Sequence, residues 1–248
     1  MEFVDKISHV KRATSIETFD FSTLYTNLPL DDIYESLKLR INKMFNNSTS
    51  SAILVNVYTG RAFWLNSGPC RTGYKQYTID KVLNALHFVL FNSYVQFGGY
   101  VFRQVKGIPM GGNASPFIAD LYVAWREFQF MYNLSKSDIA LARKFEFNSR
   151  YQDDIAIINF IGFDSIAKKI YHPTLLLEKS DHSYLWDTFL DLYVRIVQHK
   201  FVIGIYHKVD DFNFDVISFP FPESNILSSL GQKTFYSQLI RFMDYAII

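Results

Sequence analysis

The sequence has few of the features that mark secreted, membrane-bound or strongly charged proteins. Cys70 is the only cysteine among 248 residues, which excludes an internal disulfide and a cysteine-built zinc site. No uninterrupted run of about 18 apolar residues occurs, and the amino-terminal residues lack the apolar core of a signal peptide. We therefore expect an intracellular chain without membrane association, in the nucleus or an organelle, which the sequence does not distinguish.

A large excess of one charge is also missing. The chain has 25 Lys and Arg against 24 Asp and Glu, a formal net charge of +1. A nucleic-acid enzyme with this balance needs a local basic groove or basic segments supplied from elsewhere. Aromatic residues are abundant instead, with 24 Phe and 16 Tyr in a chain that is 49% hydrophobic. This composition is typical of a folded globular protein.

Local patterns predict helices mixed with mainly antiparallel strands. Apolar residues at helical spacing predict helices, and β-rich runs joined by Gly-containing turns predict hairpins. The expected elements are a helix at 33–44, a hairpin within 52–65, a helix at 79–91, a hairpin within 94–105, a helix at 116–132, a short helix ending at 167–170, and strands at 175–178, 191–197 and 201–207. The predicted fold class is α+β.

Three aspartates stand where predicted strands end or turn. Residues 15–21 alternate in polarity, which predicts a strand with Asp20 near its end. Two further β-rich runs are separated by Gln152, Asp153 and Asp154, which predicts a tight hairpin with acids at its tip. Aspartate is also an ordinary turn residue. Carboxylates are, however, the ligands that Mg²⁺ prefers, and two-metal phosphoryl transfer needs only two or three of them from the protein.

A glycine-rich loop is expected at residues 107–115. Gly107, Gly111 and Gly112 would let the backbone approach a ligand closely, because no Cβ intrudes. Pro116 then begins the predicted helix. A glycine-rich helix entry without any ligand is the plainer alternative.

Three segments resemble, in order and spacing, motifs A, B and C of reverse transcriptases, and the resemblance is closest to Penelope-like retroelements and related eukaryotic proteins. The three segments are FDFSTLYTNLP (Phe19–Pro29), GIPMGGNASPFIADLY (Gly107–Tyr122) and RYQDDIAII (Arg150–Ile158). Later segments are similar to those that follow the catalytic hairpin in Penelope-like retroelements and related eukaryotic proteins, at 171–180, 189–194, 205–226 and 235–242. The resemblance therefore covers the chain from about Thr14 to Phe242.

This resemblance implies one reverse-transcriptase-like domain over residues 1–248. Motifs A to C would occupy 14–160, and motif D/E-like and later segments would occupy 161–248. The implied fold is a right-hand polymerase palm, an antiparallel sheet with packed helices. Reverse transcriptases place most of the fingers ahead of motif A, whereas Asp20 stands close to the first residue. We therefore expect incomplete fingers and thumb, and protein partners that supply them.

The resemblance also implies catalytic roles. Asp20 and Asp153 would ligate two Mg²⁺ or Mn²⁺ ions, and Asp154 would support that site. The carbonyl of Phe21 would help to hold the nucleotide's metal. Lys179 would protonate the pyrophosphate leaving group, although an exposed lysine after a strand is ordinary.

Contacts to substrates follow from the same resemblance. Tyr25 would touch the sugar of the incoming deoxynucleoside triphosphate, where its ring would exclude a ribose 2′-hydroxyl. Met110 and Gly111 would line the nucleotide. The residues expected to contact template or primer are Gly107, Pro109, Ser115, Tyr151 and Gln152.

The expected function is an RNA-directed DNA polymerase core that extends a DNA primer on an RNA template. Clustered acids repel one another and gain little without a metal, so three retained acids favour this function. The alternative is a catalytically inactive reverse-transcriptase-derived scaffold, or an RNA- or protein-binding subunit of a larger assembly, which the near-neutral charge and missing fingers motivate. An RNA-templated RNA polymerase is a third possibility, which Tyr25 disfavours.

Overall fold

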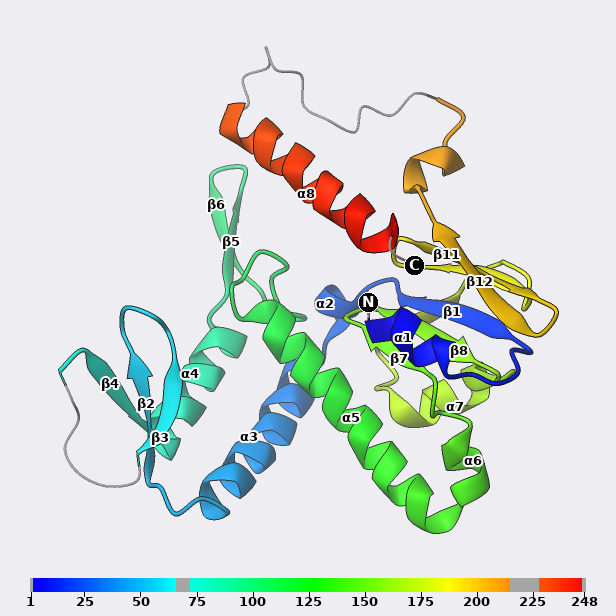
Figure 1. Ribbon diagram of the computed structural model, residues 1–248. Coiled ribbons are helices and arrows are strands. Elements are labelled where there is room, and N and C mark those ends of the chain that lie inside the picture. The colour runs from blue at the N-terminus through cyan, green and yellow to red at the C-terminus, as the bar shows by residue number, and fades with distance from the viewer. Residues whose placement is uncertain (1, 66–71, 215–227, 247–248) are drawn as a thin grey trace. The chain divides into compact units, whose positions relative to one another are not determined.

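The computed structural model describes residues 2–65, 72–214 and 228–246 (Figure 1). The chain divides into two compact units, residues 1–20, 143–161 and 179–248 in the first and residues 21–142 and 162–178 in the second. It passes from one unit to the other between Asp20 and Phe21, inside the first motif. Cys70 and residues 215–227, the latter including most of one segment of the family resemblance, lie outside the described residues.

The first unit is built on two antiparallel sheets (Figure 1). One sheet has the strand order β7-β8-β1-β9, and the other has the order β10-β11-β12. The last residue of β1 and the first two of β9 belong to the second unit. The elements are α1 (Glu2–Ser8), β1 (Ile16–Phe21), β7 (Ser149–Tyr151), β8 (Asp154–Ile158), β9 (Leu177–Lys179), β10 (Trp186–Phe189), β11 (Leu192–Val197), β12 (Lys200–Ile205), the 3₁₀ helix η1 (Lys208–Asp211) and α8 (Ser228–Ala246).

The pairing of β1 with β8 sets the core of this unit. Ile16 lies opposite Ile158, and Thr18 lies opposite Ala156. Directly opposed residues of an antiparallel pair share a face, so Ile16, Ala156 and Ile158 point the same way. Together with side chains of α1, β10 and β11 they form one apolar cluster, which consists of Phe3, Ile7, Ile16, Ala156, Ile158, Phe189, Leu192 and Val194. Each large side chain buried there contributes about 1.5–3 kcal/mol, which fixes the strand register.

The second unit contains helices, a three-stranded sheet and a separate hairpin. Helix α3 packs against α4 and α5, and α5 packs against α7. The sheet has the order β3-β2-β4, and β5 pairs only with β6 among the described residues. The elements are α2 (Leu24–Asn27), α3 (Leu30–Asn46), β2 (Ala52–Asn56), β3 (Ala62–Leu65), β4 (Tyr74–Thr78), α4 (Ile79–Phe91), β5 (Tyr94–Phe97), β6 (Tyr100–Arg103), α5 (Ser115–Ser137), α6 (Ile139–Arg143) and α7 (Phe163–Ile170).

The structure confirms the predicted mixture of helices and antiparallel strands. Both predicted hairpins form, as β2–β3 and β5–β6. The predicted strand at 175–178 forms only from Leu177, because Leu175 closes a turn by donating its N–H to the His172 carbonyl at 2.9 Å. No helix in the described ranges is long and apolar enough to cross a membrane.

A buried polar network joins three helices of the second unit. Tyr122 on α5 is fully buried, and its hydroxyl donates a hydrogen bond to Asp32 on α3. Burial and this hydrogen bond raise the pKa of Tyr122. Arg126 lies 2.9 Å from the same Asp32 carboxylate and donates from Nε to the Ile170 carbonyl at the end of α7, at 3.1 Å. The network therefore ties α5 to both neighbouring helices.

We predict that Tyr122→Phe lowers the free energy of unfolding by about 1–2 kcal/mol, because it removes a buried hydrogen bond to a carboxylate. Tyr132→Phe is the matched control, since Tyr132 lies on the same helix, is half exposed and bonds Lys136 at 2.6 Å. The control should change stability by less than about 0.5 kcal/mol. Urea denaturation measures both, and equal effects of the two variants would contradict the assigned network.

Candidate functional site

The strand register brings the three predicted carboxylates together in the first unit. Asp20 at the end of β1 lies directly opposite Asp154 at the start of β8. Opposed residues in such a pair share a face and have Cβ atoms about 4.5–5.5 Å apart. Asp153 precedes Asp154 in the turn between β7 and β8. All three acids therefore lie at the same end of one antiparallel pair.

The turn that carries Asp153 is a two-residue hairpin with unusual residues. Gln152 and Asp153 join Tyr151 to Asp154, which face each other as the last pair of the hairpin. Gln152 has a φ of 52°, a conformation that glycine or asparagine normally supplies in such turns. Arg150 stabilises the turn by donating from Nη1 to the Gln152 carbonyl at 2.9 Å. A strained residue beside three acids is more typical of a functional turn than of an ordinary one.

The charges of these acids affect one another. Burial, followed by the negative charges of Asp153 and Asp20, raises the pKa of the Asp154 carboxyl to about 6. Lys208 on η1 acts in the opposite direction and lowers that pKa. Asp154 thus carries a penalty for ionisation at neutral pH that a bound cation would relieve.

The side chains of Asp20, Asp153 and Asp154 are not arranged as a complete metal site. Within the described ranges, no group of three or more His, Cys, Asp and Glu side chains is arranged so that it could hold a metal ion. The chemistry of the donors nevertheless fits a hard cation such as Mg²⁺, which takes oxygen ligands and completes its shell with waters and substrate phosphates. Asp20 and Asp153 are the residues that would hold it, with Asp154 beside them.

We predict that Asp154→Asn stabilises the metal-free protein at pH 7. A raised carboxyl pKa means that the folded state binds the proton more tightly than the unfolded chain, so stability falls as pH rises from about 4 to about 6. The variant lacks this penalty, and it should gain roughly 1 kcal/mol at pH 7 after discounting for the partial exposure of the carboxyl.

Thermal or urea unfolding at pH 4, 5.5 and 7 measures this gain, which should shrink toward pH 4. Asp181→Asn, which alters an exposed acid of the same unit, is the control and should change little at any pH. A gain that is absent at pH 7, or equal at all three pH values, would contradict the coupling among the acids.

Lys179 forms an ion pair with a carboxylate other than the three predicted metal ligands. Its Nζ is 2.5 Å from Oε1 of Glu17, a buried residue of β1. Glu17 and Asp20 differ by an odd number of positions along the strand, so their side chains point to opposite faces of the sheet. The structure therefore does not bring Lys179 together with the three acids, and its role as a proton donor stays a prediction.

The glycine-rich loop meets the end of motif A within the second unit. Gly107, with a φ of 70°, donates its N–H to the Leu28 carbonyl at 3.2 Å. Ile108 donates to the carbonyl of Tyr25 at 2.8 Å. A Cβ on Gly107 would lie 2.6 Å from the Thr26 carbonyl oxygen, closer than a real contact allows. Close approach to the chain's own backbone therefore accounts for Gly107, and the same contacts join Tyr25 to the loop.

We predict that Gly107→Ala lowers the free energy of unfolding by roughly 2 kcal/mol or more, because the new methyl group clashes with backbone and disfavours the left-handed conformation. Gly111→Ala is the matched control in the same loop, since a Cβ there meets nothing within 4 Å and φ is not positive. Denaturant unfolding measures both, and comparable losses for the two variants would contradict this account of Gly107.

The remaining predicted contacts divide between surface and interior. Met110 and Gly111 are exposed, whereas Ser115 is buried where α5 begins. Pro109 accepts the Gly112 N–H at 3.1 Å, which closes the loop before the helix. An open loop tip with a buried base is suited to approach by a ligand at Met110 and Gly111. No ligand contact of these residues is tested, so they stay predictions.

Of the predicted residues beside the acids, Phe21 is buried and Tyr151 and Gln152 are exposed. The Phe21 ring packs edge-on against Tyr171 with centroids 4.8 Å apart. Its side chain therefore serves the core of the second unit, whereas the predicted ligand was its backbone carbonyl. Tyr151 and Gln152 are exposed at the turn of the hairpin, beside the acids, and their contact with a primer stays a prediction.

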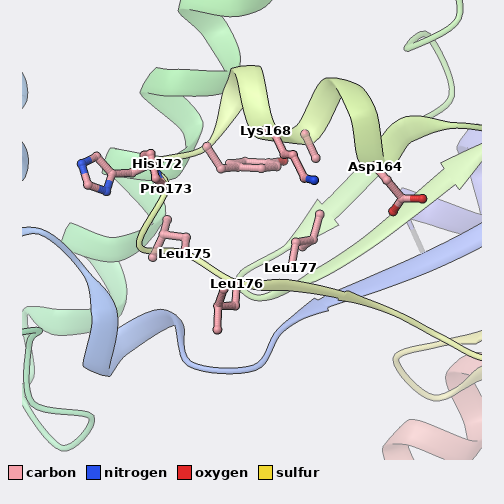
Figure 2. Close-up of a pocket in the computed structure, with 9 residues that line it drawn as sticks. Asp164, Lys168, His172, Pro173, Leu175, Leu176 and Leu177 are labelled. Carbon is pink, nitrogen blue, oxygen red and sulfur yellow. The ribbon is translucent and has the colours of Figure 1, made fainter.

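A cavity of about 360 Å³ lies elsewhere in the second unit, beside α7 (Figure 2). Its lining is largely apolar, with Asp164, Lys168 and His172 as the polar side chains. Nδ1 of His172 lies 2.8 Å from Thr174 Oγ1, so this ring belongs to a local turn. None of the catalytic or binding residues that the sequence predicts lines this cavity. We therefore assign the cavity no part in the candidate site.

Comparison with known proteins gives a likeness in fold. No family model matches the chain, and no curated protein matches it. Similar solved structures include telomerase from Candida albicans, in complex with the TWJ fragment of telomeric RNA, at a TM-score of 0.52 and 13% identity. Apo telomerase from Candida tropicalis is similar at a TM-score of 0.50 and 15% identity.

The likeness extends over most of this chain and a minor part of the telomerase chains. The matches cover 86% and 81% of this chain but only 36% and 34% of the telomerase chains. The chain thus spans about a third of the length of those proteins. The likeness shows that the chain shares the fold of part of those telomerase chains, and it supports a reverse-transcriptase-like fold. It does not identify the Penelope-like type.

Lys208 is a charged residue near the acids that the sequence did not single out. It stands 54 positions after Asp154, in η1, and no motif or spacing connects the two. Only the fold of the first unit brings its charge to bear on Asp154.

Proposed function

We propose that this chain is the palm of a reverse-transcriptase-type polymerase, which binds RNA and adds deoxynucleotides to a primer 3′ end. The observation that carries the proposal is the position of Asp20 opposite Asp154, with Asp153 beside them, on a reverse-transcriptase-like fold. Like charges opposed in a strand pair destabilise a sheet, so their presence calls for a reason other than folding.

In the proposed reaction each acid has a distinct part. Two divalent cations, when bound, would lower the charge on the triphosphate and favour the ionised primer hydroxyl. Asp20 and Asp153 would hold these ions, together with the Phe21 carbonyl. Asp154, whose pKa is raised to about 6 by burial and by the charges of Asp153 and Asp20, would keep the pair of ligands in place, and a bound cation would lower that pKa again.

The nucleotide would be selected by residues of the second unit. Tyr25 would stand against the sugar and exclude a 2′-hydroxyl, and Met110 and Gly111 at the exposed loop tip would approach the base. Tyr151 and Gln152 would contact the primer terminus. Lys179 would protonate pyrophosphate only after leaving Glu17 and moving to the side of the sheet that carries Asp20. The sequence of motifs A to C supports a Penelope-like subtype for this polymerase.

RNA is the proposed template because a fold of this kind occurs in a telomerase that was solved with telomeric RNA. The chain itself has a net charge of only +1. Extended contact with a polyanion would therefore rely on local basic groups or on partner proteins that supply fingers and thumb.

A second candidate is a catalytically inactive scaffold derived from the same fold, which would bind RNA or protein within a larger assembly. The observation that favours it is the absence, among the described residues, of a side-chain group arranged to hold a metal ion. In this case the acids would persist without ligating a cation.

Primer extension separates the two candidates. A labelled DNA primer annealed to an RNA template is incubated with the chain, deoxynucleotides and Mg²⁺ or Mn²⁺. We expect extension that requires the metal and falls by about 100-fold or more in Asp153→Asn, because that variant removes a charge that holds the cations. Asp181→Asn should extend at the wild-type rate.

The assay is repeated with the fingers and thumb of a related polymerase added as separate fragments. Extension in neither condition, with RNA binding retained, would favour the scaffold. Extension that survives Asp153→Asn would remove the carboxylates from the mechanism altogether.

A further inference from the structure

The hairpin β5–β6 exposes a row of aromatic side chains. It forms a two-stranded sheet of its own, apart from the β2–β4 sheet of the same unit (Figure 1). Phe97 is 80% exposed, Tyr100 is 72% exposed and Phe102 is 51% exposed. Isolated two-stranded hairpins are marginally stable, and contiguous apolar surface of this kind usually marks a binding site.

The strand register gathers these rings on one face. Val95 lies opposite Phe102, and Phe97 lies opposite Tyr100, so the four side chains point the same way. The Tyr100 and Phe102 rings have centroids 6.4 Å apart. Gly98 and Gly99, both with positive φ, form the tight turn that keeps the two strands in this register. One face of the hairpin is therefore a small aromatic platform.

The charge of the surrounding sequence indicates which partner the platform fits. No Asp or Glu occurs between Asp80 and Asp120, although the chain contains 24 of them. Lys106 follows β6 and is exposed. Arg103 ends β6 and is also exposed, but it lies opposite Tyr94, so its side chain starts from the other face of the hairpin, where its Nε donates to the Phe91 carbonyl at 3.2 Å. The platform and the glycine-rich loop after it thus lie in a segment that carries only positive charge, which suits a polyanion.

We propose that the face formed by Val95, Phe97, Tyr100 and Phe102 binds single-stranded nucleic acid, with bases stacked on the rings. The phosphates would lie near Lys106 and, around the edge of β6, near Arg103. Every base has a π-face, so an aromatic sheet surface flanked by cations holds a strand of any sequence. The inference rests on the proposed function, since it names a surface with which the same domain would hold its template or primer.

A second copy of the chain fits this face less well than a nucleic acid does. A symmetric contact between two hairpins would bring together two segments that carry only positive charge, and these segments would repel each other. A nucleic-acid strand covers the same rings and neutralises the same cations. The observations therefore favour the polyanion over self-association.

Fluorescence anisotropy with the full chain tests the proposal. The probes are a labelled 20-nucleotide single strand of mixed sequence, as RNA and as DNA, and the corresponding duplex. The double variant Phe97→Ala, Tyr100→Ala should weaken binding of the single strands by about tenfold or more, because stacking on two rings is lost. Tyr58→Ala is the matched control, since Tyr58 is 86% exposed in the same unit but outside the acid-free segment.

The cationic half of the proposal has its own readout. The double variant Arg103→Gln, Lys106→Gln should reduce the slope of log affinity against log salt by about 1.4, the value expected for two lost phosphate contacts on a single strand. Circular dichroism of each variant verifies that the fold is kept. An unchanged slope would overturn the assignment of these two residues.

Three other outcomes separate the aromatic platform, nucleic-acid binding by the whole domain, and self-association. Wild-type affinity in the Phe97→Ala, Tyr100→Ala variant would overturn the platform and leave RNA binding by the domain intact. Failure of the wild-type chain to bind any probe would remove nucleic-acid binding from the proposed function, and the platform with it. A wild-type oligomer in light scattering that the aromatic variant dissociates, with affinity for the probes unchanged, would assign the face to self-association and overturn the proposal.

Discussion

The repulsion between Asp20 and Asp154 is the constraint on which the site depends. Two carboxylates that lie directly across an antiparallel strand pair destabilise that pair. The register of β1 and β8 nevertheless places Asp20 opposite Asp154. That register is fixed further along the same strands, where Ile16 faces Ile158 inside the apolar core of the first unit. A one-residue slip would turn this core side chain outward. Apolar burial thus holds the acids where they repel.

The glycine-rich loop is also held in a fixed position, in this case by hydrogen bonds between backbone groups. Gly107 and Ile108 bind the carbonyls of Leu28 and Tyr25, so the loop is anchored at its start and open at Met110 and Gly111. A rigid base with an exposed tip is the arrangement that precise placement of a ligand requires. The carboxylates and the loop belong to two compact units that the chain joins between Asp20 and Phe21.

Many of the helices and hairpins, and the position of Asp153 and Asp154 at a hairpin turn, could be predicted from the sequence because the patterns that indicate them are local. The hairpin around Asp153, the β5–β6 hairpin and the helix after Pro116 each follow from alternation, turn residues or helical spacing. Other features depend on partners distant in sequence. Strand β4 has mixed polarity and forms because Thr78 to Tyr74 complete the free edge of β2. The Lys179 ion pair with Glu17 likewise requires the order of β1 and β9, which no local pattern encodes.

The central claim is that the three acids form a cation site, and direct metal binding tests it without requiring catalysis. Electron paramagnetic resonance can count bound Mn²⁺ in the presence of a deoxynucleoside triphosphate, for the wild-type chain and for Asp20→Asn. We expect the wild-type chain to bind Mn²⁺ beyond what the nucleotide alone binds, and Asp20→Asn to lose that excess. Equal Mn²⁺ binding by the two proteins would contradict the account.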